Sequence, residues 1–344
     1  MFSIFIDIIV MDEGCDDMSY KPPYTISSKM LDLVSNIMKQ IGKLSNSYGL
    51  DNKPKLRRTN MINSIYSSLA IENNALSKDQ VKDIVNGKLV IGPRRDIAEV
   101  QNAKKCYDSI LNINPYSIED LLAYHAIMLE GLVEDAGKFR TKQEGVFDGD
   151  TVIFIAPSAD RVPEHISNLF EYLNQDSENI LIKSCVFHYE FEFIHPFSDG
   201  NGRIGRLFQT CLLASKEEIF AYLPIESIIK ERQQEYYESI SKCNKVGNSN
   251  IFIEFMLDAI LETINRTIDG SRQEISEISI QVKKLLKVMR INTPYTTIEL
   301  MEALKLKSRA SFKKNYLDPA IGLNLVNMTL PNTPNSRNQR YQKI

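Results

Sequence analysis

Apolar residues recur at intervals of three and four along most of the chain, which is the spacing of one face of an α-helix. The pattern is clear in residues 31–38 and 121–129, and again in residues 236–240 and 251–264. Glycine and proline are sparse, so few of these segments are interrupted. The sequence therefore predicts a mainly α fold, with exceptions near residue 150 and at the C-terminus.

The exception near residue 150 is a pair of short β-prone runs. Residues 146–147 and 151–155 are rich in β-branched and aromatic side chains, and an Asp-Gly-Asp turn separates them. Asp-Gly between two such runs is typical of a β-hairpin. By itself, this pattern indicates an ordinary surface hairpin.

The C-terminal exception, residues 282–344, has the pattern of a winged helix. It combines three predicted helices, at 282–289, 297–304 and 308–317, with two wing strands, at 326–330 and 339–343. The segment holds 12 Lys and Arg against 3 Asp and Glu, whereas the whole chain carries a net charge of −3. Its third helix presents Arg309, Lys313 and Lys314, which indicates contact with DNA phosphates. A protein-binding role is the alternative, because many winged helices and small basic domains serve protein contacts.

Composition bounds the remaining choices. A chain of 344 residues with 43% hydrophobic and 25% charged residues is typical of a soluble globular protein of two or three units. The five cysteines are widely spaced and form no Cys-x-x-Cys pair, which argues against a disulfide framework or a zinc site and favours the cytoplasm. Residues 1–10 are apolar but too short to span a membrane, and they lack a basic start. We interpret residues 1–20 as a disordered or mis-started extension.

The densest chemistry is the run HPFSDGNGRIGR at residues 195–206. Gly200, Asn201 and Gly202 allow backbone N–H groups to approach a phosphate closely, and the N-terminus of a following helix favours negative charge. These features predict an anion-binding turn at the start of a helix.

Side chains on either side of this turn suit the chemistry of phosphate esters. Arg203 and Arg206 lie three apart, so on a helix they project from neighbouring positions and can both bind phosphate oxygens. Asp199 is a hard oxygen ligand suited to Mg²⁺ that is also held by phosphates. His195 can take up a proton near neutral pH. Taken singly, Asp199 is also explained as a helix N-cap and His195 as a core histidine.

The same run contains Gly200-x-Gly202-x-x-Gly205, which matches a dinucleotide fingerprint. That alternative requires a preceding strand in a βαβ unit. Residues 187–193 alternate like a strand, but the apolar positions from 181 to 193 also recur at helical spacing, and no strand–helix alternation follows. We therefore favour a helix before the run, ended by Pro196.

The run as a whole resembles the complete signature of the Fic family, His-x-Phe-x-(Asp/Glu)-Gly-Asn-Gly-Arg-x-x-Arg. The resemblance implies a Fic-type helical bundle that transfers AMP from ATP to a Ser, Thr or Tyr hydroxyl of a target protein or of the chain itself. Kinase-like relatives depart from the signature at the position of Gly202, so AMP transfer is favoured. The donor base and the target are not readable from the sequence.

The resemblance also implies roles for individual positions. These roles are His195 as the general base, Asp199 as the Mg²⁺ ligand, Gly200, Asn201 and Gly202 as the cradle of the α- and β-phosphates, Phe197 as the anchor of the loop, and Arg203 and Arg206 as phosphate clamps, with Arg206 reaching the γ-phosphate.

A second segment resembles the inhibitory motif of the family, (Ser/Thr)-x-x-x-Glu-(Gly/Asn). Residues 68–73 read SLAIEN, at the end of a predicted helix that Asn73 and Asn74 are suited to terminate. Ser68 and Glu72 lie one helical turn apart. The resemblance implies that Glu72 pairs with Arg206 and displaces the γ-phosphate from its productive position. Whether Glu72 also supports AMP removal is left open.

The hairpin near residue 150 resembles the flap with which the family holds a target peptide by strand addition, and Ile153 is our choice for the residue that touches the target.

The predicted division of the chain is residues 1–20 as the extension, 21–105 as an N-terminal helical region with the inhibitory helix, 106–268 as the Fic catalytic core, 269–281 as a connector and 282–344 as the winged-helix-like domain. Analogy favours a homodimer. The competing interpretation is a DNA- or protein-binding regulator that senses nucleotide through a Fic fold.

Overall fold

The structure is a computed structural model that describes residues 20–44, 54–148, 151–175, 177–277, 279–291, 293–323, 325–331, 333–334 and 336–343; within these, only the backbone is described for residues 54–55, 146–148, 151–154 and 271–277. The predicted extension over residues 1–20 lies outside the described residues except for Tyr20.

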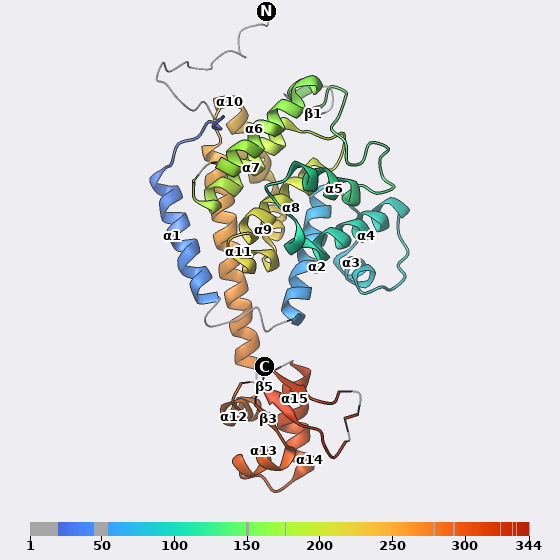
Figure 1. Ribbon diagram of the computed structural model, residues 1–344, viewed down its shortest axis with the longest axis vertical. Helices are drawn as coiled ribbons and strands as arrows, with labels where there is room; N and C mark the ends of the chain where they lie inside the picture. The colour runs from blue at the N-terminus through green and yellow to red at the C-terminus, as the bar shows by residue number, and fades with distance from the viewer. Residues whose placement is uncertain are drawn as a thin grey trace, which may run out of the picture.

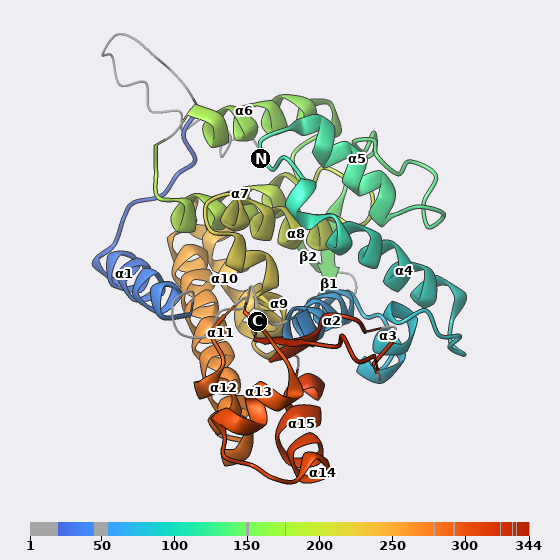
Figure 2. The same ribbon diagram turned by 60° about the horizontal axis from the view of Figure 1, so that its bottom comes forward.

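The main body is a helical bundle (Figures 1 and 2). Its first part contains α1 (Ser28–Lys43), α2 (Pro54–Ile71), α3 (Lys78–Val85), α4 (Arg94–Asp108), the 3₁₀ turn η3 (Ile110–Asn112) and α5 (Ile118–Met128). Its second part contains η4 (Ala159–Arg161), α6 (Val162–Gln175), α7 (Ile180–Ile194), α8 (Asn201–Ala214), η5 (Glu218–Tyr222), α9 (Ile225–Glu231), α10 (Gln233–Val246) and α11 (Asn250–Glu277). The mainly helical prediction is confirmed.

Helices α7 and α8 pack against each other in the middle of the body, with α4 and α5 on one side and α10 and α11 on the other (Figure 2). Almost every residue of α7 is buried, which explains why its sequence is apolar on all sides. Because α7 is a helix, the dinucleotide alternative, which requires a strand at this place, is wrong.

One continuous hydrophobic core runs through the body from Met30 to Ile268. Helix α1 lies along α11 (Figure 1) and contributes Met30, Leu33, Ile37 and Ile41 to this core. The N-terminal helices therefore pack into the same core as α7 and α8, which places the segment with the inhibitory motif directly against the segment with the phosphate-binding run.

A two-stranded antiparallel hairpin joins α5 to α6. Strand β1 (Gly145–Asp148) pairs with β2 (Thr151–Ile155) in the register Gly145↔Ile155 and Asp148↔Thr151, with an irregularity between Val146 and Phe147. The predicted hairpin is present, although residues 149–150 of its turn lie outside the described residues.

The C-terminal module has a core of its own, which runs from Val282 to Tyr341, and it follows the long α11 (Figure 1). It contains α12 (Ile280–Val288), β3 (Pro294–Tyr295), α13 (Thr297–Ala303), α14 (Arg309–Phe312), the π-turn η6 (Lys313–Leu317), α15 (Asp318–Gly322), β4 (Val326–Met328) and β5 (Tyr341–Lys343). The antiparallel sheet has the order β3-β5-β4.

The predicted third helix of the module, at 308–317, differs from the observed one. It begins as α14, widens into η6 and continues as α15 to Gly322. Strand β3 was not predicted, because a two-residue strand that ends at a helix cap leaves no periodic signal. Helices and wing strands follow one another in the predicted order, and the assignment as a winged helix stays a prediction.

Two global features complete the fold. Within the described part of the chain, no helix combines the length and the apolar character needed to cross a membrane. The four cysteines in that part, Cys106, Cys185, Cys211 and Cys243, are buried free thiols.

Candidate functional site

The run at residues 195–206 forms a tight loop between α7 and α8. Helix α7 ends at Ile194, as expected before a proline at 196, and His195 takes a left-handed backbone conformation with φ of 50°. The His195 N–H donates to the Phe191 carbonyl at 2.9 Å. Non-glycine residues seldom adopt this conformation, so the surroundings must hold it in place.

Arg140, which lies between α5 and the hairpin in the sequence, stabilises the loop through its backbone carbonyls. Its guanidinium donates to the carbonyls of His195 at 2.7 Å and Lys142 at 2.9 Å, and also to the carbonyl of Pro157. Only 3% of the Arg140 surface is exposed. Lys142 and Pro157 flank the hairpin, so a single side chain ties the base of the hairpin to the residue predicted to act as the base.

The inside of the loop is closed by Phe197 and Asn201. The Asn201 side chain accepts from the Phe197 N–H at 2.9 Å and donates to the Phe197 carbonyl at 2.8 Å. The Phe197 ring is fully buried and stacks on His125, with ring centroids 3.6 Å apart. Because the Asn201 side chain braces the loop, Asn201 can contribute to an anion cradle only through its backbone.

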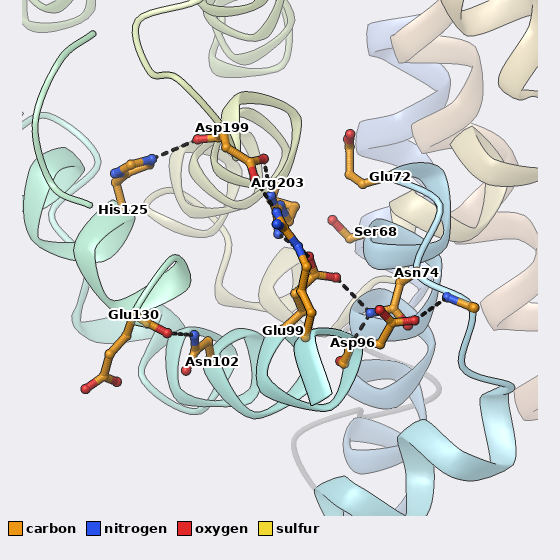
Figure 3. Close-up of polar contacts among 12 residues, drawn as sticks. Ser68, Glu72, Asn74, Asp96, Glu99, Asn102, His125, Glu130, Asp199 and Arg203 are labelled. Atoms are coloured by element: carbon orange, nitrogen blue, oxygen red, sulfur yellow. Dashed lines mark hydrogen bonds and ion pairs between the residues drawn. The ribbon is translucent and has the colours of Figure 1, made fainter. Parts of the chain in front are cut away.

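His125 also fixes the loop on its far side, and its tautomer follows from its partners. The Gly137 N–H donates to Nδ1 at 2.8 Å, so Nε2 carries the proton and donates to the Asp199 carbonyl at 3.0 Å (Figure 3). Burial lowers the pKa of His125, which keeps the ring neutral in this role. His125 is thus a core histidine, as the apolar face of its helix indicates, and also a support of the loop.

Gly200 caps the N-terminus of α8 with a φ of 85°, and a Cβ at this position would lie 2.5 Å from Leu129 Cδ2. A glycine is therefore required for both backbone and packing reasons. At Gly202, a Cβ would collide with Glu72 Oε1, so the Glu72 carboxylate would have to shift. The first N–H groups of a helix have no intrahelical acceptor, and at the start of α8 Asn201 and Gly202 line a cavity.

Arg206 is almost completely buried, with 2% of its surface exposed, and its partners come from α2. Its Nε donates to the Ser68 hydroxyl at 3.0 Å, and its Nη2 donates to the Ser68 carbonyl at 3.0 Å and to Glu72 Oε1 at 2.7 Å. Burial alone would lower the pKa of Arg206, but the charge of Glu72 raises it overall. The two residues of the SLAIEN run are thus brought to the second arginine of the loop run.

Helix α2 ends in a Schellman motif that sets the position of Glu72. Asn73 has a φ of 64°, the Asn74 N–H donates to the Leu69 carbonyl at 3.1 Å, and the Asn73 N–H donates to the Ala70 carbonyl at 3.2 Å. Glu72 is therefore the C-cap residue of α2, where the helix dipole disfavours a carboxylate unless a cation lies close by. Arg206 supplies that cation.

Arg203 belongs to a different group of contacts, drawn in Figure 3. Its Nη2 donates to Asp199 Oδ1 at 2.5 Å and its Nη1 to Glu99 Oε1 at 3.2 Å. Glu99 Oε2 in turn accepts from the Asn74 side chain at 2.8 Å. Arg203 is thereby connected to the turn that carries Glu72, through a buried carboxylate on α4.

The residues around Asp199 can hold Mg²⁺ only if a bound nucleotide supplies some of its ligands. Asp199 offers a hard carboxylate that is 32% exposed at the loop. The described residues contain no group of three or more His, Cys, Asp and Glu that could hold a metal by themselves. A cation at Asp199 would need phosphate oxygens and water for its other ligands, as Mg²⁺ commonly does in nucleotide sites.

A cavity of about 500 Å³ opens in front of these groups. One wall is the loop and the start of α8, with His195, Asp199 and Arg206, together with Glu72. The lining continues on α10 with Tyr236, Tyr237, Ile240, Ser241 and Asn244. A cavity that combines anion-binding groups with aromatic and apolar side chains matches the two halves of a nucleotide.

Two titratable groups of the cavity have shifted pKa values. Burial lowers the pKa of His195, so its imidazole is unprotonated at neutral pH and can accept a proton. Burial raises the pKa of Glu192 to about 7. Glu192 Oε1 has no hydrogen-bond partner among the described residues, and it lies 3.0 Å from the place that a Cβ of Gly205 would take.

The structure therefore places His195, Asp199, Gly200, Asn201, Gly202, Arg206, Ser68 and Glu72 at one site, with Arg203 beside them. Ile153 lies in β2, but its side chain is outside the described residues, so its contact with a target stays a prediction. Sequence reasoning missed several members of the site, namely Arg95, Glu99, Arg140, Glu192, Tyr237 and Asn244. Only Glu192 left a usable signal, as a charged residue within the otherwise apolar end of α7.

Comparisons with known proteins place this geometry in context. A family model described as Fic/DOC family matches residues 115–213, and one described as the C-terminal domain of the Fic-like filamentation-induced-by-cAMP protein matches residues 280–343. A crystal structure of a Fic family protein from Desulfovibrio desulfuricans G20 is 39% identical and has a TM-score of 0.72; the alignment covers 94% of this chain and 98% of that one.

Curated relatives are more distant. The protein adenylyltransferase fic-1 of Caenorhabditis elegans is 27% identical over 74% of this chain and 49% of its own length. The protein adenylyltransferase Fic of Culex quinquefasciatus is 30% identical over 65% of this chain and 44% of its own length. The chain thus spans about half the length of the curated relatives that it matches.

Proposed function

The chain belongs to the Fic family, and from that premise we propose that it is a protein adenylyltransferase, which moves AMP from ATP to a hydroxyl group of a protein. The observation that carries the proposal is one cavity lined by an unprotonated His195, the glycine-rich start of α8 and the buried Arg206. The names of the curated relatives support the same activity.

In the proposed reaction, the target hydroxyl oxygen attacks the α-phosphorus of ATP and forms a new P–O bond. The bond between the α-phosphorus and the oxygen bridging to the β-phosphate breaks, and pyrophosphate leaves. The hydroxyl proton passes to a ring nitrogen of His195, whose lowered pKa keeps it free to accept that proton. His195 is held for this task by Arg140, which fixes its carbonyl.

The phosphates lie in this proposal on the N-terminus of α8, where Gly200 and Gly202 leave the backbone N–H groups accessible. Asp199 would hold Mg²⁺, which when bound neutralises charge on the phosphates. The nucleoside end of ATP faces α10. There Tyr237 offers an aromatic ring, and the Asn244 side-chain oxygen accepts from the Tyr189 hydroxyl at 2.8 Å, which leaves the amide hydrogens for the nucleoside.

The resting protein is, in this proposal, autoinhibited by Glu72. The 2.7 Å ion pair to Arg206 occupies the guanidinium that the γ-phosphate would use. Glu72 also lies over Gly202, in the space in front of the phosphate cradle. ATP bound beside this carboxylate would present its α-phosphate badly to the hydroxyl, so loss of Glu72 increases transfer.

Mass spectrometry of intact protein and of peptides tests the proposal. The wild type, Glu72→Gly and Glu72→Gly/His195→Ala are each incubated with ATP and Mg²⁺, alone and with a cell extract. We expect AMP adducts with Glu72→Gly, at least about tenfold fewer with the wild type, and about 10²- to 10⁴-fold slower formation when His195 is also replaced. Absence of adducts from all three proteins, with and without extract, contradicts the proposal and favours the nucleotide-sensing regulator.

The hairpin is proposed to receive the target. An extended segment that adds to β2 would run past the entrance of the site, with Ile153 as the proposed contact. The target is proposed to be a protein with an accessible Ser, Thr or Tyr hydroxyl.

By analogy with the family, we also propose self-modification and a homodimer. The buried free thiols of the described residues agree with the cytoplasm as the expected compartment.

The C-terminal module carries a second proposed role, contact with DNA. Arg309, Lys313 and Lys314 are exposed along α14 and η6. We expect Arg309→Glu/Lys313→Glu to weaken binding of duplex DNA by about tenfold or more at moderate salt, measured by fluorescence anisotropy. Unchanged affinity would remove the support for DNA binding and favour a protein partner for the module.

A further inference from the structure

Four charged side chains close a ring at the edge of the phosphate-binding loop, and two of them, Arg95 and Glu99 on α4, belong to neither motif. Arg95 Nη2 donates to Asp199 Oδ2 at 2.7 Å, and Arg203 Nη2 donates to Asp199 Oδ1 at 2.5 Å. Glu99 Oε1 completes the ring, because it accepts from Arg203 at 3.2 Å and from Arg95 Nε at 3.4 Å. The ring alternates two guanidinium groups with two carboxylates and is neutral overall.

Both carboxylate oxygens of Asp199 are therefore in use. A divalent cation that shares Asp199 with phosphate oxygens needs at least one of these oxygens, so it competes with one of the two arginines for the negative charge there. Arg203 is poorly suited to leave, because its side chain is only 4% exposed and is also held by the buried Glu99. The Arg95 side chain is 57% exposed, so its guanidinium can turn away from Asp199 at little cost.

We propose that Arg95 competes with the divalent cation for Asp199 Oδ2, and that it thereby sets how strongly nucleotide binding depends on the metal. Arg95 is in this sense a positioning residue: it acts on the reaction through Asp199. The inference rests on the proposed function, since it takes Asp199 to be the carboxylate that meets the metal-bound nucleotide.

Two physical effects of Arg95 both weaken binding of a divalent cation to Asp199. When Arg95 is present, the cation must displace a charge-assisted hydrogen bond before it can bind Oδ2. The displaced guanidinium then stays tied to Glu99 on the same helix, close enough to repel the incoming cation. Removal of Arg95 leaves the ring with one net negative charge and one free carboxylate oxygen, and both changes favour the metal.

Removal of Arg95 should have the opposite effect on nucleotide binding in the absence of a divalent cation. Without a divalent cation, the phosphates depend on protein cations alone, and Arg95 is one of the positive charges at the entrance of the loop. Its removal therefore weakens metal-free nucleotide binding while it favours metal-assisted binding. The ratio of the two dissociation constants is the quantity in which both effects add.

Isothermal titration calorimetry with α,β-methylene ATP, which blocks transfer, measures this ratio without relying on activity. The dissociation constant is determined in EDTA and in excess Mg²⁺ for Glu72→Gly and for Glu72→Gly/Arg95→Gln. We expect the ratio of the EDTA value to the Mg²⁺ value to rise about five- to tenfold when Arg95 is replaced. Arg94→Gln in the same background is the matched control, because Arg94 is an exposed neighbour at the start of α4, and it should leave the ratio unchanged.

A ratio that is equal in the Arg95 variant and in the Arg94 control overturns the inference. Arg95→Lys provides a second check, because a compact ammonium keeps the positive charge but loses the planar fork that contacts Asp199 and Glu99 together, which should give an intermediate ratio. A ratio outside the interval between the protein with Arg95 and the Arg95→Gln variant also counts against the inference. If α,β-methylene ATP binds none of the variants in either condition, the proposed function fails and the inference falls with it. Measurable binding with equal ratios removes the inference alone.

Discussion

The two arginines of the loop run lie one helical turn apart on α8, yet the structure holds them in opposite ways. Arg206 faces α2 and pairs with Glu72, whose side chain is 35% exposed and lies at the C-terminal end of a helix. Arg203 faces α4 and pairs with Glu99, whose side chain is only 9% exposed, within a closed ring of charges.

This difference in burial means that Glu72 can be replaced as the partner of Arg206, whereas Glu99 stays paired with Arg203. A carboxylate at the C-terminus of a helix and in contact with solvent can give up its cation and be hydrated, so a phosphate can take its place. A buried carboxylate that loses its cation is left with an uncompensated charge, which costs several kcal/mol. The α2 side of α8 is thus suited to switching, and the α4 side to holding the loop.

The largest expected effect is on stability, and it should differ between the two arginines. We expect Arg203→Met to lower the free energy of unfolding by about 3 kcal/mol, because the buried Glu99 loses its buried cation and keeps only the exposed Arg95. Arg206→Met should cost about 1 kcal/mol, because Glu72 can be hydrated. Urea denaturation at neutral pH measures both values, and equal losses would contradict the distinction between the two sides.

The next effect concerns nucleotide affinity. Glu72→Gln keeps the shape of the side chain but removes the charge that competes for Arg206, so α,β-methylene ATP with Mg²⁺ should bind about tenfold more tightly. Glu99→Gln is the matched change on the α4 side and should alter the affinity by less than about threefold, because Glu99 orients Arg203 and does not occupy the cavity. Calorimetry under identical conditions compares the two; a larger gain from Glu99→Gln would reverse the comparison.

The smallest expected effect is a pH dependence confined to the Arg206 side. Glu192 has a pKa raised to about 7 by burial, and it is faced by Arg206 from α8, Glu72 from α2, Tyr236 from α10 and His188 on its own helix. Below pH 7 the carboxyl is protonated and neutral. As the pH rises through 7 it ionises and adds a negative charge beside Arg206, so phosphate binding should weaken about two- to threefold.

Glu192→Gln should remove this part of the pH dependence. The nucleotide titrates in the same range, so the informative quantity is the difference between the affinity profiles of the wild type and Glu192→Gln from pH 6 to pH 8. Parallel profiles would show that Glu192 does not titrate beside Arg206 in the way that its buried position implies.

Much of the fold and part of the site follow from local signals. The Asn73-Asn74 pair predicted the end of α2, and the Schellman motif there is the reason that Glu72 lies at a C-cap. Pro196 predicted the end of α7, and the Asp-Gly turn predicted the hairpin. Each of these signals depends on the conformational preferences of a few consecutive residues, which the sequence displays directly. The alternation of residues 187–193 was misleading, because a helix buried on all sides has no polar face to mark its period.

What the chain alone established is the set of chemical groups: a base, a carboxylate, a glycine-rich turn and two arginines at the spacing of a helix. Only the tertiary structure decided how these groups are paired. Arg95 and Glu99 reach the loop from α4, and Arg140 reaches it from the segment before the hairpin, and nothing in their local sequence marks them as neighbours of residues 195–206. Burial, pKa values and ion pairs depend on distances through space, and packing of α2, α4 and α10 around α8 sets those distances.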